Sequence, residues 1–427
     1  MRAAFYESEV TPPLGGFLWG HYNRKFAQDV IDRLYVKALV TEDDNGEVAA
    51  IIGIDSCAMP ADMHDIVTKR ITEYTGIPAD RVCITANHTH WGMPVFDSPE
   101  LRCYADEAFK DVFYRVAADA VTLAYRRLMD VEAKFGETEI RGISFCRNYV
   151  YKDGKTITHG RAGVQHERLL AEIDPAVSVM CFEHEGKPIG AVINFACHQC
   201  CCGGINGYSG DYSSELSRQL KAIYGQDFVS LFVAGTCGDL THVNNDKTIK
   251  APVGWYKEMG RRLAEKAVEA MNNSEVVTGS IECVKETMTI EKRQATPEVV
   301  RQRLEQYMQD GGSLMRVRNL IHYEATNTDK TYDVTIMTFR IGKVCFYGLP
   351  GEVFVYFGFK LKNNSKYKYN ILMENCNCYC GYIPSPEAFG ENCDLYETSL
   401  CHHSCLVPEA GDMITDRLLE ISGGFAE

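Results

Sequence analysis

The sequence has 427 residues, of which 45% are hydrophobic and 11% aromatic, so it can bury a large core and is not a disordered chain. Its 58 acidic residues outnumber the 44 basic ones, and a formal net charge of −14 argues against nucleic acid or anionic membranes as partners. The chain has no long apolar run, and its opening MRAAFYESEVTPPLGG lacks the features of a signal peptide. We therefore expect a cytoplasmic protein without stable membrane association that acts on a small molecule.

Apolar, β-branched runs of strand length alternate with helical patterns along the chain. In chain order we expect strands at 34–42 and 47–55, a helix at 63–74, a strand at 81–86, a helix at 107–128, strands at 176–183 and 188–197, a helix at 213–224, a strand at 229–235, helices at 255–271 and 297–308, and strands at 333–341 and 343–349. This order predicts an α/β fold with mixed β-sheets flanked by helices. No internal repeat or linker interrupts it, so residues 1–427 are expected to form a single domain.

The 18 cysteines are scattered through expected strand interiors. In a cytoplasmic protein most of them should be reduced, and buried free cysteine packs as a small hydrophobe. The densest group is NFACHQCCCGG at 194–204, where Cys197 and Cys200 form a CxxC around His198. A structural zinc site needs a second such pair, and CNCYC at 376–380 has a different spacing. A thiol site and a single useful histidine both remain open from these residues alone.

Other polar residues also follow expected strands, where α/β proteins build their sites. ITANHTHWG places His88 and His90 two positions apart, so both can project from one face and share a metal or divide metal binding and proton transfer between them. Two ordinary loop histidines are the alternative. Further candidates are Asp239, Thr241 and His242 in a glycine-containing turn, Glu352 after LPG, and the tyrosines Tyr382 and Tyr396. Each of these also has an ordinary structural explanation.

Taken together and in order, these segments resemble the amino-terminal catalytic domain of the neutral, non-lysosomal ceramidases. The segments that carry the resemblance are VTPPLGGFLWGHYNR, ITANHTHWG, GKPIGAVINFACHQCCCGG, VAGTCGDLTHVN, LPGEVF, CYCGYIPSPEAF and YETS. The similarity runs from about residue 5 to 400. The family's carboxy-terminal immunoglobulin-like domain has no room in this chain.

The resemblance implies a zinc site formed by His88, His198, Glu352 and Tyr382. It also implies catalytic or substrate-binding roles for His90, Arg147, Thr241 and Tyr396. Two neutral imidazoles and a carboxylate leave room for water on zinc, which lowers the pKa of that water towards about 7. Manganese or iron would fit the same donors. We therefore expect a metal-dependent hydrolase that cleaves an N-acyl bond of a small soluble substrate.

The chain also departs from the family pattern. Thr241 replaces a serine, His242 replaces a proline, and Trp91 follows His90 where the family has serine. An indole beside the site could stack on a sugar ring, so cleavage of a glycoside or modified sugar is an alternative activity. A cysteine-rich thiol or iron–sulfur protein is an alternative from another class. The sequence leaves both the substrate and the formation of a homo-oligomer open.

Overall fold

The chain is built from three copies of one structural unit. The structure is a computed structural model that describes residues 1–161, 163–244, 251–310 and 313–426. The first unit consists of β1 (Arg2–Glu9), β3 (Tyr35–Glu42), β4 (Val48–Ile54), α1 (Met63–Thr75), β5 (Val82–Ala86) and α2 (Glu107–Tyr125). The second consists of β7 (Glu132–Glu139), β12 (Ala176–His184), β13 (Lys187–Phe195), α3 (Tyr212–Tyr224), β15 (Val229–Ala234) and α4 (Trp255–Asn272). The third consists of β18 (Ile281–Glu291), β19 (Thr331–Ile341), β20 (Val344–Gly348), α7 (Val355–Asn364), β22 (Tyr369–Met373) and α8 (Ala410–Gly423).

The strand order is the same in all three sheets. It is β5-β4-β3-β1 in the first, β15-β13-β12-β7 in the second and β22-β20-β19-β18 in the third. Each unit thus has three antiparallel strands and a fourth strand that pairs in parallel with the third, as β4 does with β5, β13 with β15 and β20 with β22. The short strands β6 (Met129–Asp130) and β17 (Glu275–Val276) extend the first two sheets.

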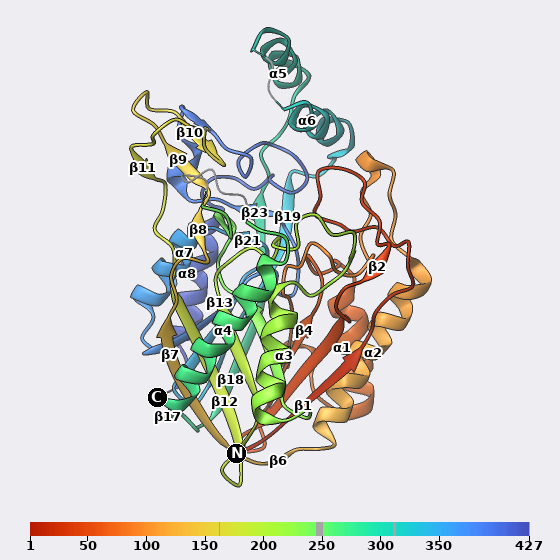
Figure 1. The fold of residues 1–427 in the computed structure, drawn as a ribbon, viewed down its shortest axis with the longest axis vertical. Helices are drawn as coiled ribbons and strands as arrows, with labels where there is room; N and C mark the ends of the chain where they lie inside the picture. Colours follow the sequence, from red (N-terminus) through yellow and green to blue (C-terminus); the bar gives the residue numbers. More distant parts are fainter. Residues whose placement is uncertain (162, 245–250, 311–312, 427) are drawn as a thin grey trace.

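The three sheets face one another around a shared interior, and helices cover their outer faces (Figure 1). A cluster of fully buried side chains from all three sheets, including Ile51, Val192 and Phe346, fills that interior. Helices α1 and α2 pack on each other beside the first sheet, α3 and α4 beside the second, and α7 and α8 beside the third. Because the central strands are covered on both faces, they read as continuous apolar runs rather than as an alternation.

The remaining elements lie in the connections. They are the strands β2 (Asp29–Val30), β8 (Phe145–Cys146), β9 (Asn148–Val150), β10 (Thr156–Thr158), β11 (Arg168–Leu169), β14 (Gly207–Tyr208), β16 (Leu240–Thr241), β21 (Glu352–Val353), β23 (Tyr382–Ile383) and β24 (Cys393–Asp394), the helices α5 (Pro297–Asp310) and α6 (Leu314–Thr326), and the 3-10 turns η1 (Ala79–Arg81), η2 (Pro99–Leu101) and η4 (Pro386–Phe389). In each unit the longest connection joins the first strand to the second. Three such insertions, at 10–34, 140–175 and 292–330, therefore protrude from the repeated framework.

The structure confirms the mixed α/β fold and all five expected helices, with ends that shift by a few residues. It corrects the expectation of no internal repeat, because the three units repeat in topology without repeating in sequence. After Leu349, Glu352 lies in the short strand β21 and α7 begins at Val355. Within the residues that the structure describes, no helix is long and apolar enough to cross a membrane.

Close packing of α4 on the second sheet gives the first prediction. A Cβ atom on Gly136 of β7 would lie 1.9 Å from the carbonyl oxygen of Ala270 in α4. The G136A substitution should therefore lower the free energy of unfolding by about 2 kcal/mol or more, since helix and sheet must move apart. Urea unfolding of G136A and of G203A tests this. A Cβ on the exposed Gly203 meets no atom within 4 Å, so equal losses in the two variants would contradict the packing argument.

Candidate metal centre

Three side chains meet where the units converge. His88 follows β5 of the first unit, His198 follows β13 of the second, and Glu352 follows β20 of the third. All three strands belong to parallel pairs, whose carboxyl ends point to one end of the molecule. The backbone of His88 has a φ of 71°, a left-handed conformation that non-glycine residues seldom adopt. This turn directs the imidazole inward instead of continuing the strand.

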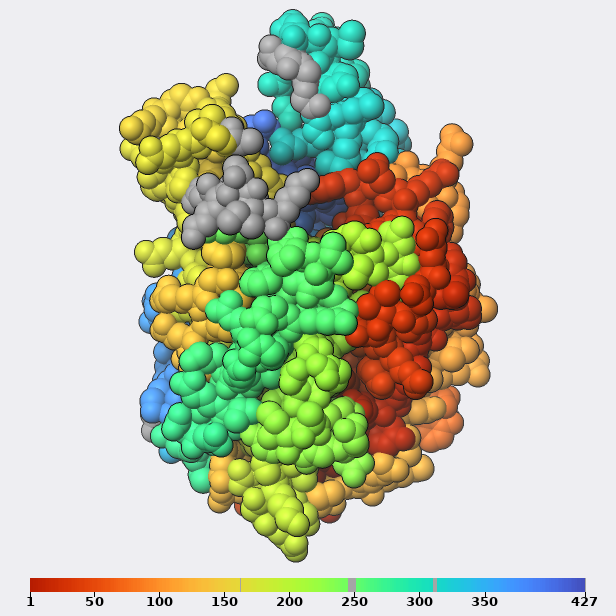
Figure 2. Space-filling view, viewed as in Figure 1, coloured from red at the N-terminus to blue at the C-terminus, as the bar shows by residue number. Residues whose placement is uncertain are grey.

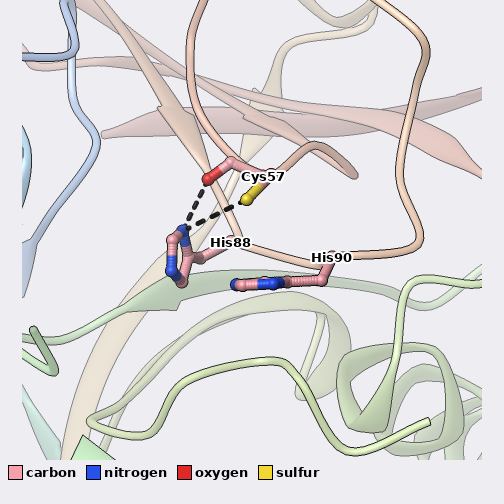
Figure 3. A group of neighbouring side chains, drawn as sticks. All are labelled: Cys57, His88 and His90. Carbon is pink, nitrogen blue, oxygen red and sulfur yellow. Dashed lines mark hydrogen bonds between the residues drawn. The ribbon is translucent and has the colours of Figure 1, made fainter. Parts of the chain in front are cut away.

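Main-chain carbonyl groups fix the orientation of both histidines. Nδ1 of His88 lies 2.6 Å from the carbonyl oxygen of Cys57, as Figure 3 shows, and Nδ1 of His198 lies 2.9 Å from that of Cys237. A carbonyl oxygen can only accept a hydrogen bond, so both Nδ1 atoms carry the proton and donate it. In the neutral rings the lone pair is then on Nε2, which is the usual state of a histidine that binds a metal.

The two Nε2 atoms face one oxygen of a carboxylate. Oε2 of Glu352 lies 3.4 Å from Nε2 of His88 and 3.2 Å from Nε2 of His198. Nε2 of His88 and Oε2 of Glu352 are buried and have no hydrogen-bond partner. Ligands of a tetrahedral zinc ion with bonds of about 2.1 Å lie roughly 3.4 Å apart. The three side chains therefore fit a metal ion of this size, with ligand atoms within 4.8 Å of one another.

The pKa values show that these side chains favour positive charge at this point. Burial by itself raises the pKa of Glu352, but interactions with His88 and His198 outweigh it and hold that pKa well below its usual value. Burial lowers the pKa of His88, yet the Cys57 thiol and Glu352 together raise it well above the usual value. A proton or a metal ion between the imidazoles and the carboxylate would equally neutralise the negative charge of Glu352 and occupy the lone pairs of the two Nε2 atoms.

Two tyrosines lie beside Glu352. The hydroxyl of Tyr379 donates to Oε1 of Glu352 at 2.7 Å, so it orients the carboxylate and leaves Oε2 directed at the histidines. Tyr382, the ligand implied by the family resemblance, pairs with Glu352 in the parallel β21–β23 ladder. Its buried hydroxyl accepts a hydrogen bond of 3.3 Å from Nη2 of Arg147. The sequence had drawn attention to the cysteines of CNCYC, whereas the structure gives Tyr379 the contact with the site.

Arg147 is held next to the metal centre by a buried ion pair. Its Nε donates to Glu397 at 2.6 Å, and its Nη2 donates to the carbonyl oxygen of Gly238 at 2.7 Å. Thr158 donates to the second oxygen of Glu397 at 2.7 Å. Nη1 of Arg147 also approaches Nε2 of His198, at 3.4 Å. Glu397 lies in the YETS segment directly after Tyr396. The sequence did not indicate that it is the counter-charge of Arg147.

The centre opens into a cavity of about 80 Å³. Its wall includes His88, Glu352, Tyr382 and two further residues selected from the sequence, His90 and Tyr396. Nε2 of His90 is buried without a partner, and the ring of His90 lies 5.1 Å from that of His88 (Figure 3). Burial and the nearby His88 and His198 hold the pKa of His90 well below its usual value. His90 is therefore a neutral proton acceptor at pH 7.

Three residues expected near the substrate do not line this cavity: Arg147, which lies behind it in the ion pair with Glu397, Thr241 and Trp91. Thr241 is buried in β16, in the turn whose Cys237 and Gly238 carbonyl oxygens hold His198 and Arg147. Trp91 packs in the main core and donates through Nε1 to the carbonyl oxygen of Ile205, so the idea that its indole stacks on substrate was wrong. Trp19, from the first insertion, is the indole that lines the cavity.

The cysteines of NFACHQCCCGG do not form a thiolate site. All 18 cysteines are free. Within the described residues, the groups able to hold a metal are His88 with His198 and Glu352, and His88 with Cys57 and His90. Cys201 and Cys202 instead use their backbone N–H groups to bind Asp211, the residue before α3. Of that segment, His198 is the residue that joins the metal centre.

The buried ion pair yields the second prediction. The E397Q substitution leaves the buried guanidinium of Arg147 without a counter-charge, so it should lower the free energy of unfolding by about 3 kcal/mol or more. E387Q removes the carboxylate that pairs with Arg168 at the surface and should cost about 1 kcal/mol at most. Chemical denaturation of the two variants provides the comparison. Similar losses would show that Glu397 does not compensate a buried charge.

Comparison with known proteins identifies the fold. No family model and no curated sequence matches the chain. Two solved structures superpose on 99% of it and on 74% of their own chains: neutral ceramidase from Pseudomonas aeruginosa, with a TM-score of 0.75 and 18% identity, and a ceramidase complexed with C2, with a TM-score of 0.76 and 17% identity. At this level of identity the similarity concerns the fold. The chain therefore has a neutral-ceramidase-like α/β fold.

Proposed function

We propose that the protein is a zinc-dependent hydrolase that cleaves the amide bond of a small, soluble N-acyl compound. The observation that carries this proposal is the approach of two Nε2 atoms to one carboxylate oxygen, at 3.2 and 3.4 Å, with both Nδ1 protons directed at main-chain carbonyls. The superposition on ceramidases adds support, because those proteins share the whole fold. Manganese or iron would be compatible with the same donors.

In this proposal His88, His198 and Glu352 hold the metal, and Tyr382 is the fourth ligand. Zinc bound there would supply Lewis acidity and make water nucleophilic near neutral pH. Nη2 of Arg147 donates a hydrogen bond to the hydroxyl oxygen of Tyr382, and this hydrogen bond lowers the cost of negative charge on the phenol oxygen. A weak phenol ligand can also yield its place to a carbonyl oxygen of the substrate.

His90 is the proposed acid and base. Water adds to the amide carbon while Nε2 of His90 accepts the proton that the water loses, and the same nitrogen returns a proton to the amine when the carbon–nitrogen bond breaks. Arg147 stabilises the negative charge that develops on the carbonyl oxygen, since Glu397 and Gly238 hold its guanidinium in place. Tyr396, in the cavity wall, and Thr241, in the adjoining turn, are assigned to substrate orientation.

Cleavage of a glycoside has less support. This alternative was based on the indole of Trp91 next to His90. Because Trp91 is buried in the core, its indole cannot stack on a sugar ring. Trp19 still offers a flat apolar wall to either class of substrate. Screening the metal-loaded protein against N-acyl amines and glycosides separates the two activities, and turnover of glycosides alone would reject the amide proposal.

Metal binding is the first test of the proposed function. The wild-type protein should contain about one zinc ion per chain, and H88A and H198A should each lose it because each removes one of the two imidazoles among the four proposed ligands. Elemental analysis and the zinc-dependent rise in melting temperature measure this. H184Q, which changes a histidine on the far β12–β13 turn, is the control. Zinc retained in both alanine variants would exclude this centre.

The pH dependence of catalysis tests His90. Because the pKa of His90 is lowered, the neutral form is present at pH 7, and activity is lost only as the pH falls through that pKa. In the pH profile of kcat/KM for an N-acyl substrate, the limb that reports His90 should lie below about pH 6.5, the ordinary pKa of histidine, and should be absent from H90Q. H90Q should reduce kcat roughly 100-fold or more with an unchanged zinc content. Full activity of a zinc-loaded H90Q protein would remove His90 from the mechanism.

A further inference from the structure

The third insertion places a helical hairpin over the metal centre. Helices α5 and α6 pack against each other and project beyond the sheets, in teal at the top of Figures 1 and 2. The inner end of α6 contacts η2, from the segment that follows His90. Met315, Arg318 and Asn319 of α6 line the cavity together with the metal-binding residues. Their spacing of three and four residues places them on one face of the helix.

Arg318 reaches the cavity without a partner. Its Nε is buried and forms no hydrogen bond, and across the described part of the chain no carboxylate lies within 4.0 Å of its guanidinium. Arg316, two residues earlier on the same helix, forms an ion pair with Asp394. Oδ1 of the adjoining Asn319 is also buried without a partner. Only Nε of the half-buried Arg318 is buried, so the rest of its guanidinium remains available to pair with an anionic group in the cavity, whereas Oδ1 of Asn319 can only accept a hydrogen bond and calls for a donor.

The acidic residues of the cavity do not meet this need. Glu352 is committed to the histidines and to Tyr379. Glu100, in η2, accepts a hydrogen bond from the hydroxyl of Ser98 and forms no ion pair with Arg318. An oxyanion that pairs with the guanidinium of Arg318 would therefore come from a bound molecule.

We propose that Arg318 binds an oxyanion of the substrate, a carboxylate or a phosphate. A planar guanidinium recognises either group through paired hydrogen bonds. This inference rests on the proposed hydrolase function and names its substrate class: a short N-acyl compound with an acidic group away from the scissile amide. The cavity beside Arg318 has a volume of about 80 Å³ and is open to solvent on one side.

The test compares R318Q with R301Q in the metal-loaded, full-length protein. Arg301 lies on the outer hairpin helix α5 and pairs with Glu298 at the surface, so R301Q removes the same charge from the same hairpin without touching the cavity. The substrates are N-acetyl amino acids and their carboxamides, followed by acetate release, and an N-acetyl amino alcohol with and without an O-phosphate. Each pair differs only in the acidic group.

For the acidic member of a pair, R318Q should raise KM roughly 10- to 100-fold, the loss expected for hydrogen bonds to a charged group. Its kcat should change little, as should both constants for the uncharged member, and R301Q should behave as wild type. R318K should recover part of the affinity. An equal loss on both members of a pair, or an unchanged KM for the acid, would overturn the proposal.

A binding measurement separates this inference from the proposed hydrolase activity. If no N-acyl compound is cleaved, succinate and inorganic phosphate are titrated calorimetrically into the metal-loaded wild type, R318Q and R301Q. Binding that is lost only in R318Q supports the oxyanion site even though the proposed reaction has failed. Equal binding by R318Q, which places the anion on the metal or elsewhere, or no binding to the wild type, overturns it.

Discussion

The structure depends on holding two imidazole nitrogens at 3.4 and 3.2 Å from one carboxylate oxygen. These atoms repel each other through their lone pairs unless a cation lies between them. The protein sustains the arrangement because each group is fixed from behind: His88 by the Cys57 carbonyl, His198 by the Cys237 carbonyl, and Glu352 by the Tyr379 hydroxyl. The donors are therefore directed at one point before any ion binds, which reduces the cost of organising the site.

The threefold repetition explains how such distant residues converge. Each unit ends its third and fourth strands in parallel, so each contributes two strand ends to the same region. His88 uses a fourth strand, while His198 and Glu352 follow third strands. Equivalent positions in the framework thus carry different residues. The fold determines where a ligand can be placed, and the local sequence determines which residue is there.

The framework was largely predictable from the sequence, because its central strands are buried on both faces and appear as strong apolar runs. The threefold repeat was not, since it is a property of topology and the units share no side-chain pattern. Of the site, the residues that end strands could be selected, including His88 and His198. Residues that act through one long-range contact could not: Tyr379 and Glu397 have no local signal, and their partners lie far away along the chain. Trp91 was misjudged because adjacency to His90 in sequence does not show which way an indole points.

The three insertions have a consequence for how such a protein can diversify. Trp19 comes from the first insertion, Arg147 from the second and Arg318 from the third, while the proposed metal ligands follow strands of the framework. Trp19 and Arg318, which we propose to contact the substrate, thus come from other stretches of chain than the proposed metal ligands, whereas Arg147 is also assigned to the reaction itself. Helix α6 is anchored by the buried Val317, Leu320 and Tyr323, whereas α5 carries mostly exposed side chains and can vary more freely. The framework fixes the proposed metal ligands, while the three insertions can vary around them. The substrate that such a protein binds can therefore change more readily than the reaction that it catalyses.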